Sequence, residues 1–464
     1  MKKLVFLSVF AFIFLLGKSS SGPAELGDYI VIAWNDLGMH CSNKDFSTLV
    51  VLPPYNNLVA QVIKRGANGS FPQLVTQGVK VTYEIPGNTY SAGKTNFWTY
   101  AEKLFGAKLP DNIGLEGTGL TGEMKAEGNH FKAKGIPITP YTDADLVNED
   151  PYQLALVKVY DSEGNLLASA KPVIPVSNEI SCVSSGCHAS EQAILNKHED
   201  EEGFDPNKKP ILCASCHSSN ALGTKGTDEA GPLSYRIHSK HANKTTDCYK
   251  CHPGQKTQCL RGAMHNAGKV CKDCHGTMSE VANSINSGRR PWLDEPSCSK
   301  SGCHASLFSP NTGKLFKDSQ GHGGLFCSAC HGSPHAEYPS SNPRDNQQMI
   351  DLQGHSGKLI ECWVCHGNTP PAAGPHDYMP VTVNDSPAMG DLSVYPNPLN
   401  GYLYIRKKGI FDGIELFNAA GERLDELISI KSSNFSEVTY DLSGLPAGIY
   451  YVKSGIHFAK IVKK

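Results

Sequence analysis

The sequence has little excess charge of either sign and, after residue 16, no long apolar run. Its 43 basic residues nearly balance its 45 acidic residues, so its charge gives no indication of a nucleic-acid or anionic-membrane partner. Lys2 and Lys3 precede an apolar run at residues 4–16 and small residues at 19–22. This pattern predicts a cleaved signal peptide at residues 1–21, because the run is too short to span a bilayer. We therefore expect an exported chain with no transmembrane segment after signal cleavage.

Cysteine is scarce at both ends of the chain. Residues 27–178 contain only Cys41, and residues 387–464 contain none. Short apolar or alternating runs at 29–34, 58–63, 79–85 and 154–160 are separated by turn residues, and Asp161–Asn165 has the composition of a hairpin loop. These patterns predict a β-rich N-terminal domain at 27–178, of the sandwich type. The length of 464 residues suggests about three domains.

Between these ends, a cysteine pair followed at once by histidine occurs seven times. Five copies have the spacing C-x-x-C-H and two have C-x4-C-H. The motif cysteines are Cys182 and Cys187, Cys213 and Cys216, Cys248 and Cys251, Cys271 and Cys274, Cys298 and Cys303, Cys327 and Cys330, and Cys362 and Cys365. The motif histidines are His188, His217, His252, His275, His304, His331 and His366.

The short spacing is the attachment signature of c-type haem, in which two thiols bond to the porphyrin and the histidine is an axial ligand of the iron. Zinc ribbons, thioredoxin-like sites and disulfide frameworks also use paired cysteines. None of them explains a histidine after every pair. We therefore expect seven covalent haem c groups, two of them at the wider motifs. The region 179–380 should consist of loops and short helices around a core made largely of haem, because its own apolar runs are too short to form one.

Further histidines are candidates for the second axial position. Seven haems with two histidine ligands each need seven histidines besides those of the motifs, and the number of further histidines in this region nearly matches. The candidates are His198, His238, His241, His265, His322, His335, His355, His376 and, from the N-terminal domain, His40. His238 and His241 are three apart, so on a helix they would share a face and could serve two haems. The alternatives, Met264, Met278 and Met349, are weaker candidates.

The segment Trp34–Cys41 is polar and ends in methionine, histidine and cysteine. Three interpretations remain open for it. A copper site would need further ligands, and only His130 is present in this domain. His40 or Cys41 could instead touch the haem array, or the segment could be an ordinary turn with a buried cysteine. Cys41 and Cys259 lie outside every motif and could form a disulfide in an oxidising compartment.

The region from about 180 to 380 resembles multihaem c-type cytochromes. The resemblance implies irons with two histidine ligands and no open position, which favours electron transfer over catalysis. The alternative is a multihaem reductase of the nitrite, hydroxylamine or tetrathionate class, with one open haem site. Such enzymes often carry an altered attachment motif, whereas all seven motifs here end in histidine.

The C-terminal region, 387–464, has alternating strands broken by turn residues, which predicts a small β-sandwich. The segments Leu392–Pro398, Ile414–Asn418 and Asp441–Lys453, followed by a basic end, are similar to the C-terminal sorting domain of the type IX (Por) secretion system. This resemblance implies type IX secretion machinery as a partner and a place on the outer cell surface or outside the cell. We therefore expect a secreted electron carrier whose partners are cytochromes or an extracellular acceptor. A homo-oligomer or filament is also possible.

Overall fold

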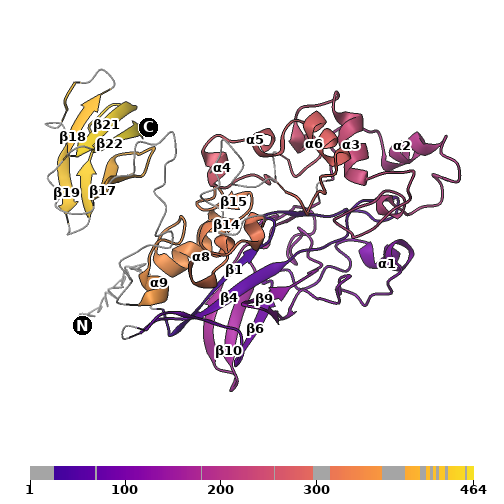
Figure 1. Ribbon diagram of the computed structural model, residues 1–464, viewed down its shortest axis with the longest axis horizontal. Helices are drawn as coiled ribbons and strands as arrows, with labels where there is room; N and C mark the ends of the chain where they lie inside the picture. The colour runs from indigo at the N-terminus through magenta and orange to yellow at the C-terminus, as the bar shows by residue number, and fades with distance from the viewer. Residues whose placement is uncertain are drawn as a thin grey trace, which may run out of the picture. The chain divides into compact units, whose positions relative to one another are not determined.

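The computed structural model describes residues 26–67, 70–178, 180–254, 257–295 and 314–367, and most of 392–464 in shorter segments (392–407, 414–418, 422–424, 428–433, 437–454 and 457–464). The chain divides into two compact units, residues 1–375 and 376–464 (Figure 1). Both predicted regions 27–178 and 179–380 fall mainly within the first unit. The predicted signal peptide, the motif Cys298/Cys303/His304 and His376 lie outside the described residues.

The first unit begins with two antiparallel sheets that enclose an apolar core. One sheet has the order β1-β4-β9-β8 with β5 also paired to β4, and the other has the order β11-β10-β6-β7. Their bounds are Tyr29–Asn35 (β1), Leu58–Lys64 (β4), Gln73–Val75 (β5), Val79–Glu84 (β6), Gly122–Glu123 (β7), Lys125–Glu127 (β8), His130–Ala133 (β9), Leu156–Asp161 (β10) and Leu166–Ala170 (β11). Val31, Leu58, Val81 and Val157 meet between the sheets. The four predicted apolar runs are therefore strands, and Asp161–Asn165 forms the predicted hairpin loop between β10 and β11.

Strand β1 is buried on both faces, which explains its almost unbroken apolar sequence. Ile32 and Trp34 point away from the sandwich core and pack against Phe326, Met349 and Val364. These partners belong to or flank the helices α7 (Cys327–His331), α8 (Pro343–Gln353) and α9 (Trp363–His366). Figure 1 shows α8 and α9 lying over β1 and β4. The motifs that end at His331 and His366 are thereby fixed to the N-terminal sheet. Met349 is buried in this apolar cluster and packs there.

Short parallel bridges attach other segments to the sandwich. β2 (His40–Cys41) pairs with β12 (Val176–Ser177), and β3 (Leu49–Val50) pairs with β13 (Ile211–Leu212). Helix α1 (Phe97–Phe105) joins Leu212 and Ala214 in a separate apolar cluster. The second motif, which begins at Cys213, is therefore held against the N-terminal domain.

The middle of the first unit has short helices and loops, as expected. The helices are α2 (Glu191–Leu195), α3 (Leu233–His241), α4 (Ala263–Asn266), α5 (Cys271–His275) and α6 (Met278–Asn286). Single 3₁₀ turns are η1 (Asn196–His198), η2 (Cys213–Ser215), η3 (Cys248–Lys250), η5 (Phe316–Asp318) and η6 (His322–Gly324), and β14 (Gly332–Ser333) pairs with β15 (Ala336–Glu337). The buried apolar side chains described between residues 180 and 295 are Leu195, Leu212, Ala214, Ala282 and Ile285. This stretch therefore has very little apolar core made by its own side chains.

The second unit has two antiparallel sheets, ordered β16-β17-β20-β19 and β18-β21-β22. The strands are Leu392–Tyr395 (β16), Tyr402–Lys407 (β17), Glu415–Asn418 (β18), Ser429–Ser433 (β19), Glu437–Asp441 (β20), Gly448–Ser454 (β21) and His457–Lys463 (β22). Leu403 and Val438 of one sheet share a core with Leu416 and Val452 of the other. The unit is thus a small two-sheet β domain.

Candidate metal centres

Each tight cysteine–histidine motif is wound into a single helical turn. The His217 amide donates to the Cys213 carbonyl (3.0 Å), and the His252 amide donates to the Cys248 carbonyl (3.0 Å). In the wide motif, the His188 amide donates to the Cys182 carbonyl (3.1 Å) across the two extra residues. The longer loop therefore returns its histidine to the same hydrogen bond with the first cysteine, so the two spacings give equivalent backbone anchors.

Five motif histidines each face a second histidine. The distances between ring centres are 6.2 Å for His217 and His198, 6.1 Å for His188 and His241, 6.2 Å for His252 and His238, 6.1 Å for His275 and His335, and 5.8 Å for His366 and His322. An imidazole nitrogen lies about 2 Å from a metal that it ligates. Two such rings on opposite sides of one ion have their centres roughly 6 Å apart. The pairs therefore have the spacing of two ligands on a shared metal.

The rings are oriented by hydrogen bonds from Nδ1 to backbone carbonyls. His238 bonds to Ser234 O (2.6 Å) and His241 to Ile237 O (2.7 Å), each one turn earlier on α3. His217 bonds to Ala230 O (3.1 Å). Since a carbonyl can only accept, Nδ1 carries the proton and Nε2 keeps its lone pair. Metal-binding histidines are commonly oriented in this way.

Burial keeps several of these rings neutral. Burial, followed by the charges of His238, His275 and His335, lowers the pKa of His252 to about 4. Burial likewise lowers the pKa of His238 and of His275. A neutral imidazole is the form that binds a metal, so these rings can coordinate at neutral pH without first losing a proton.

Burial also disfavours the charged form of some motif thiols. Burial raises the pKa of Cys213 and of Cys330 to about 12. Zinc-bound and redox-active cysteines react as thiolates, which require a lowered pKa. Within the part of the chain that the structure describes, no three His, Cys, Asp or Glu side chains converge as a metal cluster would require. The zinc and copper interpretations therefore have no preassembled site among these residues.

Cys259 is a thiol, so the disulfide considered between Cys41 and Cys259 is not formed. It lies against His335 and hydrogen-bonds to it. The charge of Cys259 is the main factor that raises the pKa of His335 to about 9. A metal bound at His335 would have to displace that ring proton, as metals generally do.

The remaining candidate ligands are placed differently. His40 is buried, its Nε2 lies 2.8 Å from Asp36 Oδ1, and its ring lies against Tyr55. His355 bonds to the Ser356 carbonyl and to Glu361 (3.3 Å). His265 lies in α4. The structure does not bring any of these three against a described motif histidine, so their assignment as ligands stays a prediction.

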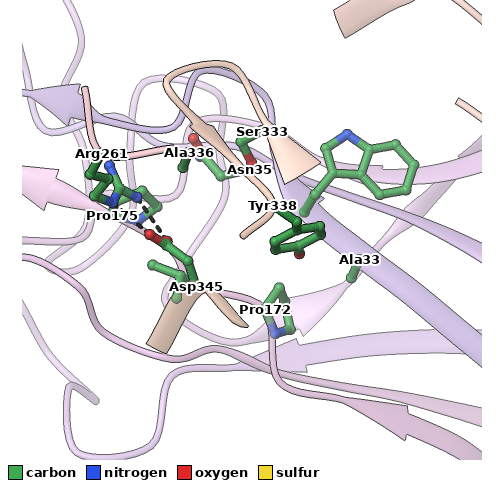
Figure 2. Close-up of a pocket in the computed structure, with 11 residues that line it drawn as sticks. Ala33, Asn35, Pro172, Pro175, Arg261, Ser333, Ala336, Tyr338 and Asp345 are labelled. Carbon is green, nitrogen blue, oxygen red and sulfur yellow. Dashed lines mark hydrogen bonds and ion pairs between the residues drawn. The ribbon is translucent and has the colours of Figure 1, made fainter. Parts of the chain in front are cut away.

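Sequence reasoning missed the contacts that hold His335 in place. Its Nδ1 bonds to the Leu37 carbonyl (3.3 Å), in the segment Trp34–Cys41. Arg261 lies beside it and forms a buried ion pair with Asp345 (2.7 Å). Arg261 and Asp345 line a small cavity of about 20 Å³ together with Tyr338, and Figure 2 shows the pair among the lining residues. The unusual polar segment is the only signal in the sequence that pointed to this region.

Comparisons with known proteins identify the C-terminal unit. Residues 393–464 match the family model for the secretion system C-terminal sorting domain. No curated protein and no solved structure matches the chain. Within the described residues, no helix is long and apolar enough to cross a membrane. The chain therefore carries a type IX sorting domain at its C-terminal end and is exported to the cell surface or the extracellular space.

Proposed function

We propose that the chain is a secreted or cell-surface c-type cytochrome with seven covalent haems, which carries electrons between the envelope and an extracellular acceptor or partner cytochrome. The observation that carries the proposal is the set of five histidine pairs at 5.8–6.2 Å, each containing one motif histidine. The motif cysteines would form the thioether bonds, and the paired histidines would ligate the iron from both sides.

The donor set fits haem better than a free metal ion. Each pair offers two protein ligands, whereas a structural zinc site needs four. A bound porphyrin would supply four nitrogen ligands to the iron, and the two imidazoles of a pair would supply the other two. The scarcity of buried apolar side chains between residues 180 and 295 also suits a region in which large apolar groups form much of the core.

Two histidines on one iron favour electron transfer over substrate chemistry. Bound haem iron supplies reversible one-electron redox chemistry. The paired imidazoles leave no position for a substrate, and their Nδ1 bonds to carbonyls such as Ser234 O and Ile237 O fix each ring before the metal binds. A reductase would instead require at least one iron without its second histidine.

Neighbouring pairs are close enough to form a series. Helix α3 supplies His241 to His188 and His238 to His252, so these two centres lie on successive positions of one helix face. His275 and His335 are near His252, since their charges lower its pKa. Burial is the main cause of the raised pKa of Cys213, and the charge of the nearby Cys182 adds to it. These neighbours support a series of four centres, from the His217 pair to the His275 pair.

Electron paramagnetic resonance of the purified, oxidised protein tests this function. The expected result is low-spin haem throughout, with no change on adding cyanide or nitrite. His241→Ala should convert one haem in seven to a high-spin form that binds cyanide. Lys240→Ala, on the same helix and exposed, is the matched control and should leave all spectra unchanged.

Two outcomes would contradict the proposal in different ways. A wild-type high-spin signal that shifts with nitrite would support the reductase alternative. A purified protein without covalent haem would refute both the electron-carrier function and the reductase alternative.

A further inference from the structure

His335 has an unusual backbone for a candidate ligand. It lies in the turn between β14 and β15 with φ at +67°, a conformation that non-glycine residues seldom adopt. Its carbonyl accepts hydrogen bonds from the amides of Arg261 and Gly262 (both 2.8 Å), and its amide donates to Glu337 Oε1 (2.9 Å). Strained residues of this kind persist where the surroundings hold them, and they are common at functional sites.

The N-terminal turn that begins at Asn35 holds the His335 side chain. Asn35 Oδ1 accepts from the amides of Leu37 (3.0 Å) and Gly38 (2.7 Å), which fixes the turn. The Leu37 carbonyl then faces His335 Nδ1 at 3.3 Å. Gly38 has φ at +75°, and a Cβ there would overlap the carbonyl of Pro334, the residue before His335. The turn can approach this closely only because residue 38 is glycine.

Arg261 joins the turn to the loop that carries His335. Its guanidinium is buried and donates to Asp345 through Nε (2.7 Å) and Nη2 (2.9 Å). Its Nη1 donates to the Gly38 carbonyl (2.7 Å), and its Cζ lies 4.8 Å from the Tyr152 ring centre. Figure 2 shows the paired groups of Arg261 and Asp345. The Arg261 side chain therefore connects the N-terminal turn with helix α8, while the backbone amide of the same residue holds the His335 carbonyl.

We propose that Gly38 and Arg261 are positioning residues that hold His335 opposite His275, so that the N-terminal domain secures the sixth ligand of this one centre. The inference rests on the proposed function. It gives the turn at Leu37 and Gly38, within the segment Trp34–Cys41, a role next to the candidate ligand His335. The sixth ligand of the His275 centre thus depends on residues that are distant in sequence. By contrast, His238 and His241 are oriented by carbonyls of their own helix.

The test compares the spin states of four variants of the haem-loaded full-length protein. His335→Ala defines the spectrum of the vacated centre. Gly38→Ala pushes on the Pro334 carbonyl, and Arg261→Met removes the link while keeping an apolar stem. Arg344→Gln removes a nearby, exposed ion pair with Asp150 (2.6 Å) and is the matched control.

The expected result is the same new high-spin, cyanide-binding haem, one in seven, in His335→Ala, Gly38→Ala and Arg261→Met, with no change in Arg344→Gln. Arg261→Lys should restore part of the low-spin signal, because it retains a positive donor. The six other haems report that the chain has folded. If Gly38→Ala does not fold, the comparison of Arg261→Met with Arg261→Lys tests the positioning role by itself.

Separate results would overturn the inference and the function. Seven low-spin haems in Gly38→Ala and Arg261→Met, beside a high-spin haem in His335→Ala, would refute the positioning role alone. Seven low-spin haems in His335→Ala would refute the assignment of His335 as a ligand and, with it, this inference. Absence of covalent haem from the wild type would refute the proposed function itself.

Discussion

Breaking the Arg261–Asp345 ion pair should strongly destabilise the first unit. The side chains are 2% and 5% exposed, so Asp345→Leu leaves a buried guanidinium without its main partner. Removing one member of a buried pair typically costs about 3–5 kcal/mol. Because Arg261 keeps its bond to the Gly38 carbonyl, we expect a loss near the middle of that range, about 4 kcal/mol.

The double variant Arg261→Met/Asp345→Leu separates the pair from its neighbours. It removes both charges but leaves the Gly38 and Cys259 carbonyls without the Arg261 donor. An unsatisfied buried group costs about 1–3 kcal/mol. With two such carbonyls, the double variant should lose about 2–6 kcal/mol, less than the sum of the two single losses of about 3–5 kcal/mol each.

Guanidinium denaturation followed by far-ultraviolet circular dichroism measures these values on the haem-loaded chain. Arg344→Gln, which breaks an exposed pair, should change stability by less than about 1 kcal/mol. The reasoning would be refuted if Asp345→Leu stayed within about 1 kcal/mol of the wild type, or if the single losses added in the double variant.

Three further predictions concern other parts of the chain. Burial raises the pKa of Asp36, but the charge and hydrogen bond of His40 and a bond from Asn57 lower it overall below 3.8. The ionised Asp36 therefore stabilises the folded chain above pH 3.8, and this stabilisation is lost as the pH falls through the pKa of Asp36 in the folded state. Asp36→Asn should flatten the acid limb of the stability curve measured between about pH 2 and 5. Ile32→Ala, at a position with 0% exposure, should cost about 2–5 kcal/mol in denaturant titrations, whereas Phe71→Ala, with Phe71 73% exposed, should cost less than about 0.5 kcal/mol; equal losses would refute the packing assigned to β1. Deleting residues 393–464 should abolish surface or extracellular accumulation in fractionated cells while leaving the haem spectrum intact, and continued export would refute the sorting role.

The strands and one helix could be predicted because their signals are local. Alternation and turn residues located β4, β6 and β10 to within a few residues. The spacing of His238 and His241 predicted a shared helix face, and α3 presents them to two different motif histidines. In both cases the periodicity of the backbone fixes which side chains lie together.

The other pairings could not be predicted because they depend on contacts distant in sequence. His335 reaches His275 through a turn that is held by residues near position 37, and no periodicity encodes that approach. The sequence left open whether His40 reaches the array, and it could not show that the Nε2 of His40 lies 2.8 Å from Asp36 Oδ1. Among the described motif histidines, His188 faces His241 and His366 faces His322, whereas the assignment of His265 and His355 as ligands stays a prediction.

Mass spectrometry of the purified, secreted protein tests the central claim most directly. Each of the seven cysteine–histidine motifs should yield a peptide carrying one covalently bound haem, and the intact mass should exceed that of the processed polypeptide by seven haems. A protein with five haems would exclude the two wide motifs. Peptides with unmodified thiols at all seven motifs would contradict the account.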